Sequence, residues 1–220
     1  MDTLELPVIV IGGGGHAKVL VGALLRCGEN ILGFADLNPA APPLLGIDRL
    51  GDDNAVFLHA PGDVRLVNGV GSAASTVNRQ KVYERFTRKQ YRFATVIHPS
   101  AIIALELQIE EGVQIFAGAI LQPGSRIGCN AIVNTGAIVD HDCVVVAHAH
   151  IAPGVVLSGG VRVDSGAHIG AGASIIQGVS IGAGSIVGAG AVVIRDVPAG
   201  VTVAGVPAKV ICRPVAQNIG

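Results

Sequence analysis

The sequence predicts a small α/β domain followed by a parallel β-helix. From Ile109 to Val193 every sixth residue is Ile, Leu or Val, in fifteen consecutive positions. The residue three places after each is usually glycine, and the next is small or β-branched. Such a period is typical of a β-helix in which each hexapeptide forms one flat side and three sides make a coil of about 18 residues. Residues 1 to about 93 lack this period and read as alternating strands and helices.

The N-terminal segment has the order of a βαβαβ half-unit. The expected elements are a strand at 6–11, a helix ending near Gly28, a strand at 31–35, a strand at 64–70, a helix at 75–86 and a strand at 93–97. The apolar contacts expected of the two helices are Val19, Ala23, Leu24, Val77, Val82 and Phe86. We therefore expect a half-Rossmann domain over residues 1–93 and a β-helix with a C-terminal tail over residues 94–220. The first coil looks imperfect, because Ile102 and Ile109 are seven residues apart.

The composition argues against several classes of protein. Apolar residues make up 50% of the 220 residues and Trp is absent, which suits a core of Ile, Val and Ala. The net charge of -1 without a basic stripe argues against nucleic acid as a partner. No apolar run approaches the length of a membrane span, so no membrane association is expected.

The cysteines indicate a reducing compartment. The sequence has four of them without a CxxC pair, namely Cys27, Cys129, Cys143 and Cys212. A cytoplasmic protein is therefore expected. Cys143 falls on an inward-facing small position of the repeat, so packing is its expected role.

A glycine run, Gly12 to Gly15, follows the first strand and precedes the first helix. Together with Ala17 it matches G-x-G-x-x-A, and Asp36 ends the second strand about twenty residues later. A dinucleotide needs two such halves, and only one precedes the repeats, so a mononucleotide or a nucleotide sugar is the expected ligand. Backbone N–H groups at the helix N-terminus would face phosphate and Asp36 would accept ribose hydroxyls. The alternative is a glycine turn that only tightens the packing of strand and helix.

The glycine pattern of the repeat is interrupted in one stretch. Asp142 and His148 replace glycine in successive repeats. Four of the seven histidines, His141, His148, His150 and His168, lie within 28 residues. Because a solenoid surface offers histidine no packing role, this stretch predicts a functional patch. Solvated histidines on a turn are the alternative.

Zinc is one reading of this patch, because β-helix carbonic anhydrases hold zinc with three histidines. His150 and His168 occupy equivalent places one coil apart, about 4.8 Å along the strand stacking. No set within one chain offers a three-ligand site, so no metal is expected. A carbonic anhydrase would instead contain stoichiometric zinc.

A general base is the preferred reading of the patch. His141 is flanked by Asp140 and Asp142, and a carboxylate bonded to one ring nitrogen fixes the tautomer and raises basicity. Attack by an amine or hydroxyl on an activated acyl group needs such a base and a backbone N–H for the developing oxyanion. The glycines after Ser158, about one coil downstream of His141, are placed to supply that N–H. The sequence offers no plausible nucleophile for a covalent acyl-enzyme.

The whole pattern resembles the hexapeptide-repeat sugar O- and N-acetyltransferases that carry a small nucleotide-binding domain before a left-handed β-helix. The motifs that carry the resemblance are Gly-Gly-Gly-His-Ala at 13–17, Asn-Thr-Gly at 134–136, Val-Asp-His-Asp-Cys at 139–143, His-Ile-Ala-Pro-Gly at 150–154, Leu-Ser-Gly-Gly at 157–160 and Gly-Val-Pro-Ala-Lys at 205–209. The resemblance covers nearly the whole chain. It implies the left-handed coil and a homotrimer with active sites between adjacent subunits.

The resemblance also implies residue roles. His141 would be the base and Asp142 its polarising partner. The acetyl-CoA-binding residues would be His150, Gly159, Ala171, Ala189, Pro207 and Lys209, with the Gly159 N–H on the thioester oxygen. The nucleotide-sugar contacts would be Gly14, Gly15, His16, Asp36 and Gly71. Residues 72–79 are longer than in uridine-nucleotide relatives, so their contacts are left open.

The implied reaction is N-acetylation of the 4-amino group of a 4-amino-4,6-dideoxy nucleotide sugar, with GDP-perosamine as the expected acceptor. The residues alone leave the nucleotide base, the exact sugar and the choice of amine or hydroxyl acceptor open. O-acetylation of a sugar such as sialic acid and a non-catalytic nucleotide-sugar-binding scaffold are the alternative functions.

Overall fold

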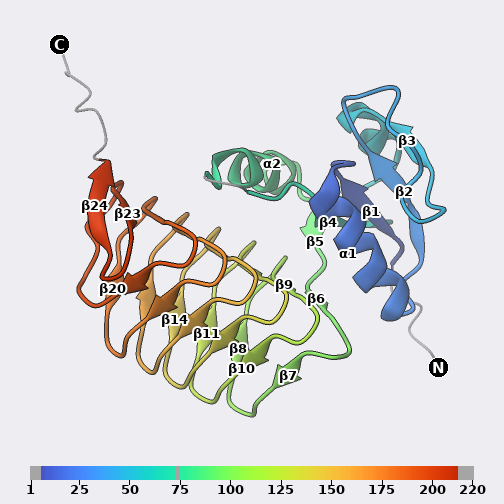
Figure 1. The fold of residues 1–220 in the computed structure, drawn as a ribbon. Coiled ribbons are helices and arrows are strands. Elements are labelled where there is room, and N and C mark those ends of the chain that lie inside the picture. Colours follow the sequence, from blue (N-terminus) through green and yellow to red (C-terminus); the bar gives the residue numbers. More distant parts are fainter. Residues whose placement is uncertain (1–5, 73–74, 213–220) are drawn as a thin grey trace.

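A computed structural model describes residues 6–72 and 75–212. It contains an α/β unit followed by a parallel β-solenoid (Figure 1). The predicted fold class is therefore confirmed. The end of the expected C-terminal tail, from residue 213 on, lies outside the described residues.

The α/β unit is built on one parallel sheet with the strand order β3-β2-β1-β4-β5. Its strands are β1 (Val8–Ile11), β2 (Ile31–Ala35), β3 (Arg49–Gly51), β4 (Arg65–Asn68) and β5 (Arg92–Phe93). Its helices are α1 (Gly15–Arg26), the 3₁₀ helix η1 (Asp53–Leu58) and α2 (Val77–Thr87). The strand β3 and the helix η1 were not predicted. The Pro-rich stretch before them has no apolar periodicity that would predict a strand or a helix.

Two of the expected helix contacts were wrong. Val19 is 52% exposed and Val77 is 49% exposed. The buried face of α1 is the i, i+3, i+4, i+7 stripe Ala17, Leu20, Val21 and Leu24, joined by Ala23. Val19 points away from this stripe, and Val77 is the first residue of its helix. Phe86 is fully buried, and Val82 packs partly buried beside it.

The solenoid has three parallel faces, and strands that pair are 18 residues apart up to β22, as between His150 and His168. The eight-stranded face holds β6 (Val96–Ile97), β9 (Gln114–Ile115), β12 (Ile132–Val133), β15 (His150–Ile151), β18 (His168–Ile169), β21 (Ile186–Val187), β23 (Thr202–Ala204) and the antiparallel β24 (Lys209–Cys212). The six-stranded face holds β7 (Ile102–Ile103), β10 (Ile120–Leu121), β13 (Ile138–Val139), β16 (Val156–Leu157), β19 (Ser174–Ile175) and β22 (Val192–Val193). The five-stranded face holds β8 (Gln108–Ile109), β11 (Arg126–Ile127), β14 (Val144–Val145), β17 (Arg162–Val163) and β20 (Ser180–Ile181).

The transition between the two units differs from the expected single strand at 93–97. The chain pairs with β4 through β5 and then with β9 through β6, so it leaves one sheet and enters another. The first coil is also more regular than expected. Ile103 pairs with Leu121 and Ile97 pairs with Ile115, so the period of six extends back to Ile97.

The corners of the coil explain the glycine spacing. From Glu106 to Gly190, the third residue of each corner has a positive φ, which glycine adopts without strain. Asp142 (φ 57°) and His148 (φ 64°) adopt this conformation, as their place in the repeat predicts. Asn130 and Glu106 occupy the same corner position and were missed. The inward side chains form one apolar core, and Cys143 is fully buried in it, as expected.

The α/β unit docks on the eight-stranded face. The core around α1 includes Phe116 and Ile132 of the solenoid. The helix α2 follows the corner between the five- and eight-stranded faces, where Arg79 contacts Asn130 and Tyr83 contacts His148. We call the region where the α/β unit contacts the eight-stranded face the junction.

Candidate active site

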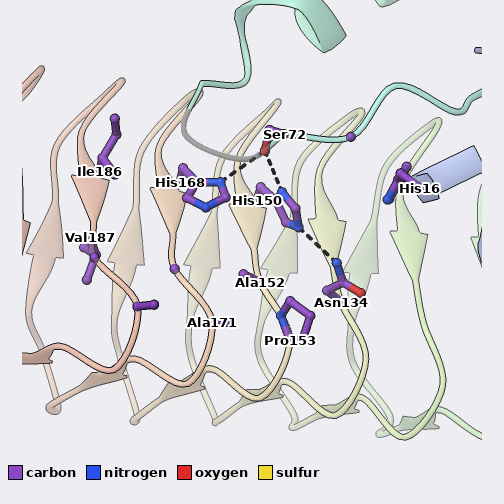
Figure 2. A pocket seen from close by; sticks show the side chains of 14 residues that line it. His16, Ser72, Asn134, His150, Ala152, Pro153, His168, Ala171, Ile186 and Val187 are labelled. Atoms are coloured by element: carbon purple, nitrogen blue, oxygen red, sulfur yellow. Dashed lines mark hydrogen bonds between the residues drawn. The ribbon is translucent and has the colours of Figure 1, made fainter. Parts of the chain in front are cut away.

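A cleft of about 420 Å³ lies at this junction (Figure 2). The loop after β4 closes one side, side chains of the eight-stranded face form the floor, and small residues of the next corner form the far wall. Its lining residues are His16, Gly71, Ser72, Asn134, His150, Ala152, Pro153, His168, Gly170, Ala171, Ile186, Val187, Gly188 and Ala189. The cleft brings together five of the predicted site residues, namely His16, Gly71, His150, Ala171 and Ala189.

A second hollow of about 420 Å³ adjoins the first over the glycine run. Its lining residues are Gly12, Gly13, Gly14, Gly15, His16, Asp36, Gly69, Val70, Gly71 and Ser72. The two hollows share His16, Gly71 and Ser72. All five predicted nucleotide-sugar contacts therefore line one connected depression that runs from the α/β unit onto the solenoid.

Asp36 has a structural role in this depression. Its Oδ2 accepts a hydrogen bond of 2.5 Å from the Gly13 N–H, and its Oδ1 accepts one of 2.8 Å from the Asn38 N–H. A β-carbon at Gly13 would lie 2.8 Å from the Phe34 ring and 3.0 Å from Asp36 Oδ2. The glycine turn is thus packed tightly, as expected if it tightens the packing of strand and helix. It also borders an open hollow.

His16 is held in one tautomer by Gln114. The Gln114 amide nitrogen donates to the Asn68 carbonyl at 2.8 Å, which turns its oxygen toward His16 Nε2, also at 2.8 Å. Burial and the positive charge of Arg79 lower the pKa of His16 to about 4. The neutral ring therefore donates through Nε2 and presents Nδ1 as an acceptor.

Two polar side chains and two histidine rings form a hydrogen-bond chain across the floor of the cleft (Figure 2). Nε2 of His150 bonds Asn134 Nδ2 at 3.1 Å, and Nδ1 bonds Ser72 Oγ at 2.6 Å. Ser72 Oγ also bonds His168 Nδ1 at 3.1 Å. Burial, aided by His168, His16 and Arg79, lowers the pKa of His150 to about 2, and burial lowers the pKa of His168.

The prediction that these histidines have no packing role was wrong. His148, His150 and His168 are at most 8% exposed, because the α/β unit covers the face that carries them. His148 Nδ1 bonds Asn130 Nδ2 at 2.9 Å and its ring packs edge-on against Tyr83. The repeat pattern of the solenoid alone does not show that the α/β unit covers this face.

His141 and Asp142 lie elsewhere, on the corner between the six- and five-stranded faces. Nδ1 of His141 bonds Asp142 Oδ2 at 2.8 Å, and the exposed ring has a pKa raised by that hydrogen bond and by Asp140. Gly159, one coil on, is so close that a β-carbon there would lie 2.5 Å from His141 Nε2. The Gly159 N–H donates to no acceptor among the described residues. This corner thus joins a basic nitrogen and a free backbone donor.

The corner and the cleft are separate within one chain. Ala171 and Ala189 follow β18 and β21, whereas His141 and Gly159 follow β13 and β16. The strands of the six-stranded face lie between the two corners. None of His141, Asp142 and Gly159 lines the cleft.

Pro207 and Lys209 lie at the C-terminal end of the solenoid. Their segment packs against β22, where the Ala208 N–H donates to the Val192 carbonyl at 2.8 Å. Val192 follows Ala189 by three residues, so this segment adjoins the end of the cleft wall. It does not line the cleft itself.

Several residues of the junction were missed in the sequence. Ser72 and Gln114 are polar groups whose partners come from the other unit, and Asn134 bonds His150 one coil further along the solenoid. No local spacing in the sequence predicts these contacts. Arg79 is fully buried on α2 and donates to the carbonyls of Asn68 and Val70 at 2.7 and 2.9 Å. Residues 73 and 74 of the segment left open at 72–79 lie outside the described residues.

Within residues 6–72 and 75–212, no three His, Cys, Asp or Glu side chains are grouped to hold a metal ion. In the same part of the chain, no helix has the length and apolar character needed to cross a bilayer.

Comparison with known proteins supports a common fold and family. Residues 7–86 match the model of the PglD N-terminal domain. PerB from Caulobacter crescentus, solved in complex with CoA and GDP-perosamine, is 42% identical, with a TM-score of 0.87 over 94% of this chain and 97% of that chain. The H141A variant of GDP-perosamine N-acetyltransferase from the same organism is also 42% identical, with a TM-score of 0.88 over the same shares. The acetyltransferase domain of PglB from Neisseria gonorrhoeae is 32% identical, with a TM-score of 0.87 over 94% of this chain and 100% of that chain.

A third relative extends the likeness. WeeI from Acinetobacter baumannii is 30% identical, with a TM-score of 0.82 over 94% of this chain and 100% of that chain. The agreement covers both the α/β unit and the solenoid, in the same order along the chain. This chain therefore belongs to the family of hexapeptide-repeat sugar acetyltransferases that carry a PglD N-terminal domain.

Proposed function

We propose that this protein transfers the acetyl group of acetyl-CoA to the 4-amino group of a 4-amino-4,6-dideoxy nucleotide sugar, with GDP-perosamine as the acceptor. The observation that carries the proposal is the His141 ring, bonded to Asp142 at Nδ1 and adjacent to Gly159 at Nε2. Base, polarising carboxylate and backbone donor are the groups that direct acyl transfer needs. The 42% identical relative was solved with CoA and GDP-perosamine, which supports the choice of donor and acceptor.

The mechanism begins with the proton of the sugar ammonium. Nε2 of His141 takes this proton, and the free amine attacks the acetyl carbon of the thioester. The Gly159 N–H donates to the thioester oxygen as negative charge develops on it. Collapse of the tetrahedral intermediate breaks the C–S bond, and the proton held by His141 passes to the thiolate. The nitrogen loses its second proton to solvent, and the products are an amide and free CoA.

The substrates have separate places in this proposal. The nucleotide sugar lies over Gly14, Gly15, His16, Asp36 and Gly71. Acetyl-CoA lies along His150, Ala171 and Ala189, and its nucleotide end reaches Pro207 and Lys209. The small side chains of the cleft wall leave room for the narrow pantetheine arm.

A neighbouring subunit completes each site. The base corner and the cleft lie on successive corners of one chain, so a cleft receives His141 from a neighbour in a homotrimer. Residues 1–93 then bind the nucleotide sugar, and residues 94–220 hold acetyl-CoA and the base. The reaction takes place in the cytoplasm, whose reducing conditions suit a sequence with four cysteines and no CxxC pair.

The test is release of free thiol from acetyl-CoA, with and without a panel of amino-sugar nucleotides. GDP-perosamine is expected to stimulate release, and His141→Asn is expected to abolish most turnover while keeping CoA binding. His98→Asn, which alters a solenoid histidine outside both hollows, is the matched control and should retain the wild-type rate. An unchanged kcat in His141→Asn would refute the base.

The same assay separates the alternatives. Release with a hydroxyl sugar but with no amino sugar would favour O-acetylation. No release with any acceptor would favour a nucleotide-sugar-binding scaffold.

A further inference from the structure

The cleft contains a hydrogen-bond chain whose direction follows from one amide. Oδ1 of Asn134 accepts the Thr135 N–H at 2.8 Å, so the other end of the amide, Nδ2, is the donor to His150 Nε2. A neutral imidazole that accepts at Nε2 carries its hydrogen on Nδ1. The deep burial of His150 keeps it neutral, so its tautomer is fixed by Asn134.

The direction continues through Ser72. The Nδ1–H of His150 donates to Ser72 Oγ at 2.6 Å, which leaves the serine hydrogen for the next bond. That hydrogen is directed at His168 Nδ1, 3.1 Å away. His168 therefore accepts at Nδ1 and carries its own hydrogen on Nε2.

No described residue accepts the Nε2–H of His168, and this nitrogen is not enclosed by protein, since the one enclosed polar side-chain atom without a partner among the described residues is Nη2 of Arg79. Its ring is 6% exposed and lines the cleft. Both nitrogens of His150, by contrast, are engaged by protein. The Nε2–H of His168 is therefore open to the cleft, where it can donate to an acceptor of a bound ligand.

We propose that His168 is a ligand-binding residue whose Nε2–H donates to an oxygen of the bound substrate, and that Ser72 is the positioning residue that sets its tautomer. The identity of the substrate rests on the proposed function. Three parts of those substrates carry such an oxygen: the diphosphate, the sugar and the amide carbonyls of pantetheine. Ser72 belongs to the loop that also borders the glycine run. Its hydrogen bonds to the two histidines therefore couple that loop to the floor of the cleft.

Two variants of His168 test the position of the donor. The amide nitrogen of Gln reaches the place of Nε2, whereas that of Asn reaches only the place of Nδ1. We expect His168→Gln to keep the Kd near that of the wild type. His168→Asn should weaken binding about threefold to tenfold for a neutral acceptor, and more for a phosphate.

Calorimetry with GDP, GDP-perosamine and CoA identifies the oxygen. A loss with GDP and with GDP-perosamine assigns the diphosphate, a loss with GDP-perosamine alone assigns the sugar, and a loss with CoA assigns pantetheine. Any of these losses in His168→Asn supports the proposal, provided that His168→Gln keeps a Kd near that of the wild type. Equal Kd values for the Asn and Gln variants with all three ligands would overturn it.

Ser72→Ala tests the positioning role, because it releases the tautomer of His168 without touching the ring. The ligand weakened by His168→Asn should be weakened by Ser72→Ala as well. Ser100→Ala is the matched control, because Ser100 Oγ makes the same kind of bond, 2.8 Å to His98 Nδ1, outside both hollows. If Ser72→Ala and Ser100→Ala bind alike, Ser72 has no such role. Should His168→Asn fail to fold, this serine pair decides the proposal.

The outcome is distinguishable from that of the proposed function. Wild-type protein that releases no thiol with any acceptor overturns the acetyl-transfer proposal, and the binding comparison still decides the role of His168. Wild-type turnover combined with equal binding by all variants overturns only the present proposal.

Discussion

Gly159 lies against the imidazole of His141, with a hypothetical β-carbon 2.5 Å from Nε2 and 2.6 Å from Cε1. The two residues are one coil apart, and the Gly160 N–H donates to the His141 carbonyl at 2.8 Å. The stacking of coils therefore holds a backbone donor and the basic nitrogen side by side. The ring of His141 can occupy this position because residue 159 is glycine and has no β-carbon.

Gly159→Ala is expected to displace the ring and to lower kcat about 100-fold, because a shift of about 1 Å in a catalytic group has that effect. The backbone of Gly159 has an ordinary φ, and its neighbour is the tip of an exposed side chain. Stability should therefore change little. Steady-state kinetics and thermal unfolding measure the two effects.

The control for this substitution is Gly62→Ala, since no atom lies within 4 Å of its hypothetical β-carbon and its φ is also ordinary. It should retain wild-type kinetics. Wild-type kcat in Gly159→Ala would show that the ring position does not limit the reaction.

The second prediction concerns the acidic limb of kcat/KM. The hydrogen bond that the ring of His141 donates to Asp142, together with the charge of Asp140, raises the pKa of His141. The neutral ring is the active base, so activity falls as pH decreases through this raised pKa. Asp142→Asn removes the larger cause and should move the limb to lower pH. Asn also suits the positive φ of 57° at this position.

Substitutions of two further carboxylates serve as comparisons for the shift of the acidic limb. Asp140→Asn should shift the limb in the same direction by less, because its charge acts without a bond to the ring. Asp164→Asn, whose carboxylate bonds Arg162 instead, should leave the limb unchanged. A limb that stays in place in Asp142→Asn would mean that another group titrates.

The third prediction concerns the buried cation of the junction. Arg79 donates to the carbonyls of Asn68 and Val70 in one unit and of Asn130 in the other. Arg79→Lys keeps a buried charge but concentrates its donors at one nitrogen, which cannot reach both units. We expect a loss of about 2–4 kcal/mol in the free energy of unfolding, since at least one buried carbonyl loses its donor. Urea unfolding measures it.

Arg88→Lys, at the exposed residue that caps the C-terminus of the same helix, is the control for Arg79. Arg88 is paired with Glu84 at i,i+4 and its side chain is 77% exposed. Its substitution should change stability by less than about 0.5 kcal/mol. Equal stability of the two variants would show that Arg79 does not hold the units together.

The regular part of the molecule was predictable because its cause is local. A period of six with a left-handed corner residue leaves a visible trace, and the 18-residue stacking put Gly159 beside His141. The junction was not predictable, because its contacts depend on how two units dock. Asn130 and His148 interrupt the glycine pattern as Asp142 does, yet they pack under α2, whereas Asp142 bonds the exposed His141. The same sequence signal thus has two causes, and only the docked structure separates them.

The last prediction tests whether two chains build one site. His141→Asn inactivates the base corner, and Gly71→Ala should block the cleft, because its β-carbon would lie 2.9 Å from His16 Cβ. If each site takes its base from one subunit and its cleft from the next, trimers reassembled from equal amounts of both inactive variants contain intact pairs at about one quarter of their sites. Roughly that share of wild-type activity should return on mixing. Each variant reassembled alone is the control and should stay inactive. A site within one chain would leave the mixture inactive as well, because every chain then carries one of the two defects.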